Sequence, residues 1–220
     1  MIFVNFKTYQ EGSGKAAVSL IHLIEEVASE TQTKIIPVVS ATDIKESALG
    51  SKLEIWTKKI DPVEFGAHTG SIIAEAVFED GASGTFLNHS EAKFENFEDL
   101  KTANTRAMSI GLKTLIFASD LNELRLVLEL KPTYVSYEPP ELIGSATTSV
   151  VQAKPEIIKE AAEMARGFGI PLIVGAGIHS REDVKKSVEL GATGIAVASD
   201  IVKSENPKAE LLDLVEGFTA

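Results

Sequence analysis

Short apolar runs alternate along the whole chain with polar or glycine-containing stretches and with longer segments of helical periodicity. The apolar runs are continuous rather than alternating, which is typical of strands buried on both faces of a parallel sheet. They predict eight strands, at Ile2–Val4, Ile35–Val39, Leu53–Trp56, Thr85–Leu87, Thr114–Phe117, Thr133–Ser136, Leu172–Val174 and Gly194–Val197.

Helices are predicted between these strands, where apolar residues recur at a spacing of about 3.6 residues. Pro155 suits the first turn of one such helix. Ser180, followed by Asp183, is typical of a helix start with an acidic first turn. The clearest helical segments are residues 17–27, 157–168 and 211–218.

Eight strands alternating with helices in 220 residues predict an α/β fold, namely a (β/α)₈ barrel in which residues 1–220 form a single domain. The rival is a doubly wound open sheet, which usually has fewer strands and a glycine-rich loop after the first. Here the first strand runs into Asn5-Phe6-Lys7, so the barrel is favoured. An active site is then expected at the carboxyl ends of the strands.

Composition narrows the classes of partner. The 44% of hydrophobic residues can form a large core, and the net charge of −11 argues against nucleic acid and anionic membranes. The chain has no cysteine, which excludes disulfides and thiolate sites. No apolar run approaches the roughly 18 residues of a membrane helix, and no signal peptide is recognisable. We therefore expect a soluble cytoplasmic protein.

Chemically capable side chains follow several predicted strands directly. Asn5 and Lys7 come after the first strand, His89 and Glu91 after the fourth, and Glu138 after the sixth. Taken alone, Glu138 fits a solvated surface loop equally well, and Lys7 fits a lysine on the rim. Their shared position at the ends of different strands makes a common acid–base site the better hypothesis.

A lid and an anion site are predicted beside these residues. Prolines follow Glu138 directly and a glycine ends the stretch, so a stiff tip lies between flexible ends. Gly175-Ala176-Gly177 and Ala198-Ser199 follow the seventh and eighth predicted strands, where many barrels bind phosphate on backbone N–H groups. The glycine pair alone is equally compatible with a tight turn.

Together these motifs resemble those of the triosephosphate isomerase family, in its compact archaeal branch, in the same order along nearly the whole chain. The resemblance implies interconversion of dihydroxyacetone phosphate and D-glyceraldehyde 3-phosphate, a step of glycolysis and gluconeogenesis. The matching stretches are residues 4–9, 66–70, 88–91, 137–144, 175–178 and 198–199.

The resemblance also implies roles for individual residues, and the family is itself a familiar example of pKa tuning. Glu138 would be the base, and neutral His89 the electrophile that polarises the carbonyl. Lys7 would supply positive charge, Asn5 a hydrogen bond to a substrate oxygen, and Glu91 an ion pair with Lys7. The implied substrate and phosphate contacts, besides Asn5 and Lys7, are Ile143, Gly144, Ser145, Gly175, Gly177, Ala198 and Ser199.

Some residues depart from the family pattern. Ala198-Ser199 stands where many members have two glycines, and Ala146 follows Ser145 at the far hinge of the lid, where glycine is common. Alanine has less backbone freedom there, which bears on lid motion more than on chemistry. Lys58 stands where the family has a glutamine.

The family further implies a homodimer or homotetramer, in which a loop carrying Phe65, His68 and Thr69 contacts the neighbouring subunit. We expect no cofactor and no metal, since the four histidines show no ligand spacing; His22 and His179 are interpreted as surface or helix-start residues. Two alternatives remain: another phosphate-binding barrel enzyme, and a non-catalytic relative that binds a phosphometabolite or a protein.

Overall fold

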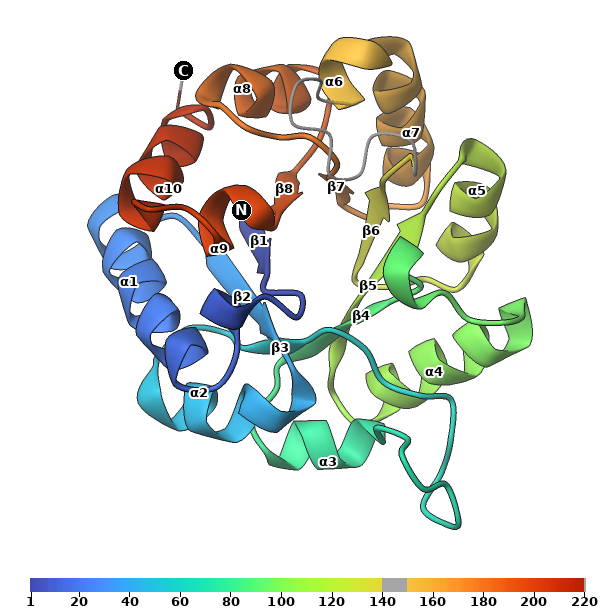
Figure 1. The fold of residues 1–220 in the computed structure, drawn as a ribbon. Coiled ribbons are helices and arrows are strands. Elements are labelled where there is room, and N and C mark those ends of the chain that lie inside the picture. Colours follow the sequence, from blue (N-terminus) through green and yellow to red (C-terminus); the bar gives the residue numbers. More distant parts are fainter. Residues whose placement is uncertain (140–149, 220) are drawn as a thin grey trace.

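The computed structural model describes residues 1–139 and 150–219 of the chain. Eight parallel strands close into a barrel, because β8 pairs with β1 as well as with β7. The predicted (β/α)₈ barrel is therefore confirmed (Figure 1). The strands are β1 (Ile2–Asn5), β2 (Ile35–Val39), β3 (Trp56–Thr57), β4 (Gly84–Leu87), β5 (Lys113–Ala118), β6 (Tyr134–Tyr137), β7 (Leu172–Val174) and β8 (Gly194–Val197).

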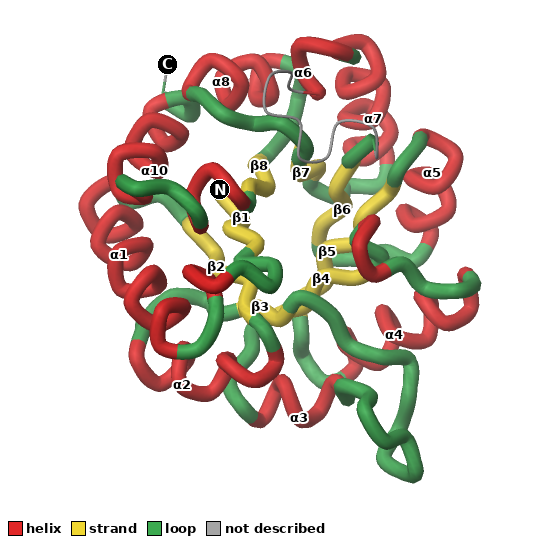
Figure 2. The backbone as a smooth tube through the Cα atoms, viewed as in Figure 1, coloured by secondary structure: helices red, strands yellow, loops and turns green. Residues whose placement is uncertain are grey.

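Helices form a ring outside the barrel, as the backbone trace shows (Figure 2). Short 3₁₀ turns, η1 (Gln10–Gly12), η2 (Ala41–Asp43) and η3 (Ser90–Ala92), follow β1, β2 and β4. The helices are α1 (Lys15–Thr31), α2 (Ile44–Gly50), α3 (Ala74–Glu79), α4 (Phe97–Ser109), α5 (Leu121–Glu129), α6 (Val150–Ala153), α7 (Pro155–Gly167), α8 (Arg181–Glu189), α9 (Ser199–Val202) and α10 (Pro207–Glu216).

Helix starts agree with the local sequence signals. Pro155 is the first residue of α7, where its missing N–H has no helical partner to lose. The Ser180 side chain accepts a hydrogen bond from the backbone N–H of Asp183 and caps α8. Both helix starts were predicted at these residues, and both are confirmed.

The barrel interior is filled by aromatic and aliphatic side chains. Phe3 lies edge-on to Trp56 with ring centroids 5.0 Å apart, and it also contacts Phe86 and Tyr134. Gly84 makes room for this packing, since a Cβ there would lie 2.4 Å from the Trp56 indole. A filled interior leaves the mouth of the barrel as the place for a ligand.

The third strand differs from the prediction. It was expected at Leu53–Trp56, whereas only Trp56 and Thr57 pair with β2 and β4. Leu53 is partly buried and packs on the core between the barrel and the helices. The apolar run therefore reflects side-chain burial in the approach to the strand, without the backbone pairing that defines a strand.

The connection between β3 and α3 projects away from the ring of helices (Figure 1). It carries Phe65, whose side chain is 70% exposed.

Among residues 1–139 and 150–219, we find no helix with the length and apolar character needed to cross a membrane.

Candidate active site

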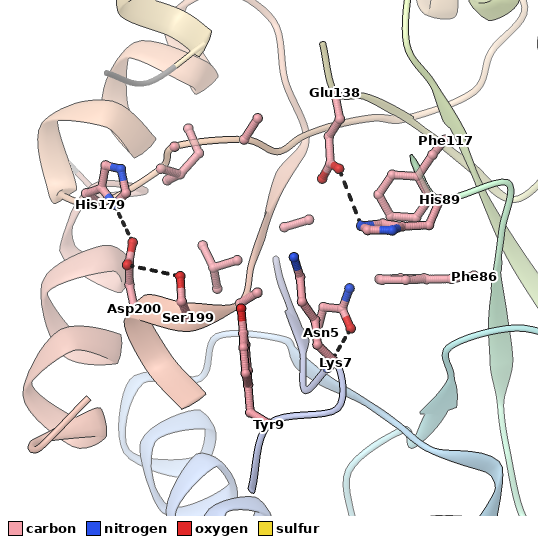
Figure 3. Close-up of a pocket in the computed structure, with 16 residues that line it drawn as sticks. Asn5, Lys7, Tyr9, Phe86, His89, Phe117, Glu138, His179, Ser199 and Asp200 are labelled. Carbon is pink, nitrogen blue, oxygen red and sulfur yellow. Dashed lines mark hydrogen bonds and ion pairs between the residues drawn. The ribbon is translucent and has the colours of Figure 1, made fainter. Parts of the chain in front are cut away.

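Glu138 and His89 face each other in the mouth of the barrel (Figure 3). Glu138 directly follows β6, and its backbone N–H donates to the carbonyl of Ala118 at the end of β5. His89 lies two residues after β4. Both side chains are buried, and Oε2 of Glu138 lies 3.7 Å from Nε2 of His89. Strands far apart in the sequence thus bring a carboxyl group and an imidazole together.

The turn before His89 is held by Asn88, a non-glycine residue with a φ of 61°. Its side-chain amide donates to the carbonyl of Phe117 at 3.1 Å and to Oε1 of Glu123 at 2.8 Å. These bonds stabilise the left-handed backbone conformation that turns the chain at this point. The His89 ring then packs edge-on against Phe117, with centroids 4.9 Å apart.

The tautomer of His89 follows from its hydrogen bonds. Nδ1 accepts from the backbone N–H of Glu91 at 3.2 Å, so the proton of a neutral ring is on Nε2 and points toward Glu138. Burial, with a contribution from the charge of Lys7, lowers the pKa of His89 to about 4, although Glu91 opposes the shift. At neutral pH the ring is an uncharged hydrogen-bond donor.

The pKa of the Glu138 carboxyl group is shifted upward, opposite to that of His89. Burial raises its pKa to about 8, with Lys7 opposing this and Glu91 adding to it. Gly175 makes this burial possible, because a Cβ there would lie 1.8 Å from Oε1 of Glu138. A carboxylate with a raised pKa is a stronger base than an ordinary one.

Lys7 enters the same cavity from the end of β1. Its ammonium group pairs with Oε1 of Glu91 at 2.8 Å, as the family resemblance implied. Its backbone N–H donates to Oδ1 of Asn5 at 3.0 Å, while its own φ is 44°. The Lys7 side chain therefore extends into the cavity beside the Glu138–His89 pair, from a backbone that a hydrogen bond to Asn5 holds in place.

The opposite wall is built after β7 and β8. Gly177, Ala198 and Ser199, which are among the predicted phosphate contacts, line the cavity there. Gly177 has a φ of 69°, in the left-handed region that favours glycine. Gly175, also predicted as a phosphate contact, lies against the Glu138 carboxyl group. The predicted lid contacts Ile143, Gly144 and Ser145, and the hinge residue Ala146, lie outside the described residues.

Three side chains at the mouth of the barrel make contacts that the sequence did not predict. His179 was interpreted as a helix-start residue, and it does precede the cap of α8, yet it also lines the cavity and pairs with the Asp200 carboxylate. The Tyr9 ring lines the same cavity between the two walls (Figure 3). Lys58 donates from its ammonium group to the backbone carbonyl of Lys7. The sequence marked Lys58 only as a departure from the family pattern and Tyr9 only as part of a matching stretch, because their contacts depend on which loops meet at the mouth.

No group of three or more histidine, cysteine or acidic side chains suited to a metal ion occurs within residues 1–139 and 150–219. His22 is exposed and contacts the carbonyl of Gly50, in keeping with its interpretation as a surface residue. Phe65, His68 and Thr69, the predicted interface residues, are exposed in the projecting connection.

The fold and the site together define a (β/α)₈-barrel protein with a buried carboxyl–imidazole pair at the carboxyl ends of its strands. A family model described as triosephosphate isomerase matches residues 1–217. The chain belongs to the triosephosphate isomerase family, as its motifs indicated.

Archaeal proteins named triosephosphate isomerase match this chain along nearly their whole length. The protein named triosephosphate isomerase from Metallosphaera sedula is 39% identical over 218 residues, which cover 99% of this chain and 95% of the relative. Those from Methanobacterium bryantii and Archaeoglobus fulgidus are 37% and 35% identical over 217 residues, covering 98% of this chain and 95% and 96% of the relatives.

Proposed function

We propose that the protein is an isomerase that interconverts dihydroxyacetone phosphate and D-glyceraldehyde 3-phosphate by proton transfer through an enediolate. The observation that carries this proposal is the 3.7 Å approach of the Glu138 carboxyl to Nε2 of neutral His89, in a cavity that Lys7 also enters. Family membership supports a phosphorylated triose as the substrate.

Glu138 is the base in this proposal. Interchange of an aldose and a ketose needs one base that reaches two adjacent carbons: it removes a proton from the carbon beside the carbonyl and returns it to the neighbouring carbon. Burial that raises the Glu138 pKa to about 8 supports this role, because the carboxylate gains proton affinity. General base catalysis of this kind contributes roughly 10²–10⁴-fold.

His89, Lys7 and Asn5 act on the oxygens. The Nε2–H of His89 polarises the carbonyl and moves protons between the two oxygens, for which an uncharged ring is suited. Lys7 stabilises the negative charge of the enediolate and the phosphate. Because Asn5 accepts from Lys7 through Oδ1, we assign its amide N–H groups to a substrate oxygen. Each preorganised donor of this type contributes about 10²–10³-fold.

The phosphate is held on the opposite wall, by backbone N–H groups around Gly177, Ala198 and Ser199, which line the cavity. We include Gly175 as the residue that gives the base its space. The lid contacts implied by the family, Ile143 to Ser145, complete the phosphate site in this proposal. Closure would exclude water, which matters because an exposed enediolate can eliminate its phosphate.

The two alternatives now have less support. Another phosphate-binding barrel enzyme would not match the family over residues 1–217. A non-catalytic relative would not need Asn5, Lys7, His89 and Glu138 in one cavity. The net charge of −11 and the absence of cysteine fit a cytoplasmic protein whose partners are small phosphorylated metabolites, not nucleic acid or membranes.

A coupled assay that interconverts the two triose phosphates tests this function. We expect activity in the purified protein, loss of at least about 10²-fold in kcat for Glu138→Gln, and a comparable loss in kcat/KM for Lys7→Ala. Comparable turnover in Glu138→Gln would remove the base assignment. An inactive wild-type protein would favour a binding role.

We also propose that the chain forms a homodimer or homotetramer. The projecting connection leaves the Phe65 side chain 70% exposed, with His68 and Thr69 beside it. A large apolar side chain in that position is more stable when a second copy covers it. Size-exclusion chromatography with light scattering tests this, and a fully active monomer at micromolar concentration would contradict it.

A further inference from the structure

The backbone of Lys7 is held in an unusual conformation. Its φ of 44° lies in the left-handed region, which a residue with a side chain adopts at a cost of about 1–3 kcal/mol. Such a conformation persists only where neighbouring groups hold it in place. One of these groups is Asn5, whose Oδ1 accepts from the Lys7 N–H at 3.0 Å.

The second group is Lys58, which holds the other end of the same residue. The Lys58 ammonium group donates to the backbone carbonyl of Lys7. Lys58 is itself fixed to the barrel, since its backbone N–H donates to the carbonyl of Val39 at 3.1 Å, directly after β3. A side chain based on the third strand thus reaches the loop after the first.

Two carboxylates favour the charged form of the half-buried Lys58 side chain. Burial lowers the Lys58 pKa, whereas Asp43 and Glu91 oppose that shift. A charged donor makes a stronger hydrogen bond to a carbonyl than a neutral one. The next residue offers a contrast: the Lys59 ammonium group pairs with Asp61 at 2.7 Å and takes no part in the contact with Lys7.

We propose that Lys58 is a positioning residue of the isomerase reaction, which keeps the Lys7 backbone in its left-handed conformation and so aims the Lys7 ammonium group at the substrate. This inference rests on the proposed function. It also accounts for a lysine at a position where the family pattern has glutamine, because both side chains can donate a hydrogen bond to the carbonyl.

Three single variants test the role. Lys58→Met removes the donor and keeps most of the side-chain volume, Lys58→Gln keeps an N–H donor, and Lys59→Met is the matched control. We expect Lys58→Met to lose about 10- to 100-fold in kcat/KM, the range for a hydrogen bond to a charged group. Lys58→Gln should recover most of this loss, and Lys59→Met should stay within about twofold of wild type.

A double-mutant cycle separates positioning from general destabilisation. If Lys58 acts through Lys7, Lys58→Met should cost little further activity in a Lys7→Ala background. Binding of inorganic phosphate, measured by calorimetry on the same proteins, should weaken in Lys58→Met and recover in Lys58→Gln. Lys58→Ala replaces Lys58→Met if the latter does not fold.

The outcomes are distinct from those for the proposed function. An inactive wild-type protein contradicts the isomerase proposal, and phosphate binding then still decides the role of Lys58. Wild-type kcat/KM and phosphate affinity in Lys58→Met overturn the positioning role. The full loss repeated in the Lys7→Ala background overturns it as well, since Lys58 would then act independently of Lys7.

Discussion

Gly175 and Glu138, on the neighbouring strand ends of β7 and β6, approach so closely that a Cβ on residue 175 would lie 1.8 Å from Oε1 of the carboxyl group. Glycine is needed at this position because a side chain would clash with the carboxyl group, and not because of its backbone flexibility. The position of the Glu138 carboxyl group is therefore determined by the absence of a side chain on residue 175, directly after β7.

Gly175→Ala should displace the Glu138 carboxylate and reduce kcat by about 10²-fold, the usual effect of misplacing a catalytic group by about 1 Å. The isomerase assay measures this directly. The matched control is Gly167→Ala at the end of α7, where a Cβ would have nothing within 4 Å. That variant should keep wild-type kcat; equal activity in both variants would contradict the spatial role of Gly175.

The pH dependence of kcat/KM should report the ionisation of Glu138. A base must be deprotonated to act, so kcat/KM of the free protein should rise with pH and level off above the Glu138 pKa of about 8. His89, with a pKa of about 4, should add no further step at neutral pH. A profile that is flat from pH 6 to pH 9, roughly two units below to one unit above this pKa, would contradict the burial effect.

Glu91→Gln and Lys7→Met should move that profile in opposite directions. Glu91 raises the Glu138 pKa and Lys7 lowers it. Removing the charge of Glu91 should therefore shift the rise in kcat/KM to lower pH, and removing that of Lys7 should shift it to higher pH. Glu91→Gln keeps the backbone N–H that sets the His89 tautomer. Shifts of the same sign in both variants would exclude this electrostatic account.

Glu138→Gln should be more stable than the wild-type protein, by an amount that increases as pH rises. The Glu138 pKa is raised from 4.5 to about 8, so between these values the folded state binds more protons than the unfolded state and its stability falls with increasing pH. The variant avoids this loss. We expect its advantage in unfolding free energy to grow by about 4 kcal/mol as the pH rises from 4.5 to about 8, since one pKa unit corresponds to 1.36 kcal/mol.

Urea denaturation at pH 5 and pH 8.5, just above the ordinary carboxyl pKa of 4.5 and just above the shifted value of about 8, measures this difference. The exposed Glu160 on α7 supplies the control variant, Glu160→Gln, whose effect should be small at both pH values. An advantage of Glu138→Gln that stays constant with pH would show that the buried charge is not its cause.

Local patterns in the sequence predicted much of the architecture. Continuous apolar runs identified the strands because both faces of a parallel barrel strand are buried, and Ser180 and Pro155 marked helix starts because caps act within one turn. The third strand was misplaced because Leu53 is partly buried but does not pair with a neighbouring strand. The order of motifs then sufficed to recognise the family and to nominate Glu138, His89 and Lys7.

The sequence by itself determined the barrel, the family and the residue types at its mouth. Continuous apolar runs, helix caps and the order of motifs can all be recognised along the chain without knowing which segments meet. The tertiary structure alone decided the states of those residues. Desolvation shifts the pKa of Glu138 and His89, and it depends on atoms brought in from other strands. The space beside Gly175 and the reach of Lys58 to the Lys7 carbonyl likewise arise only where distant loops meet.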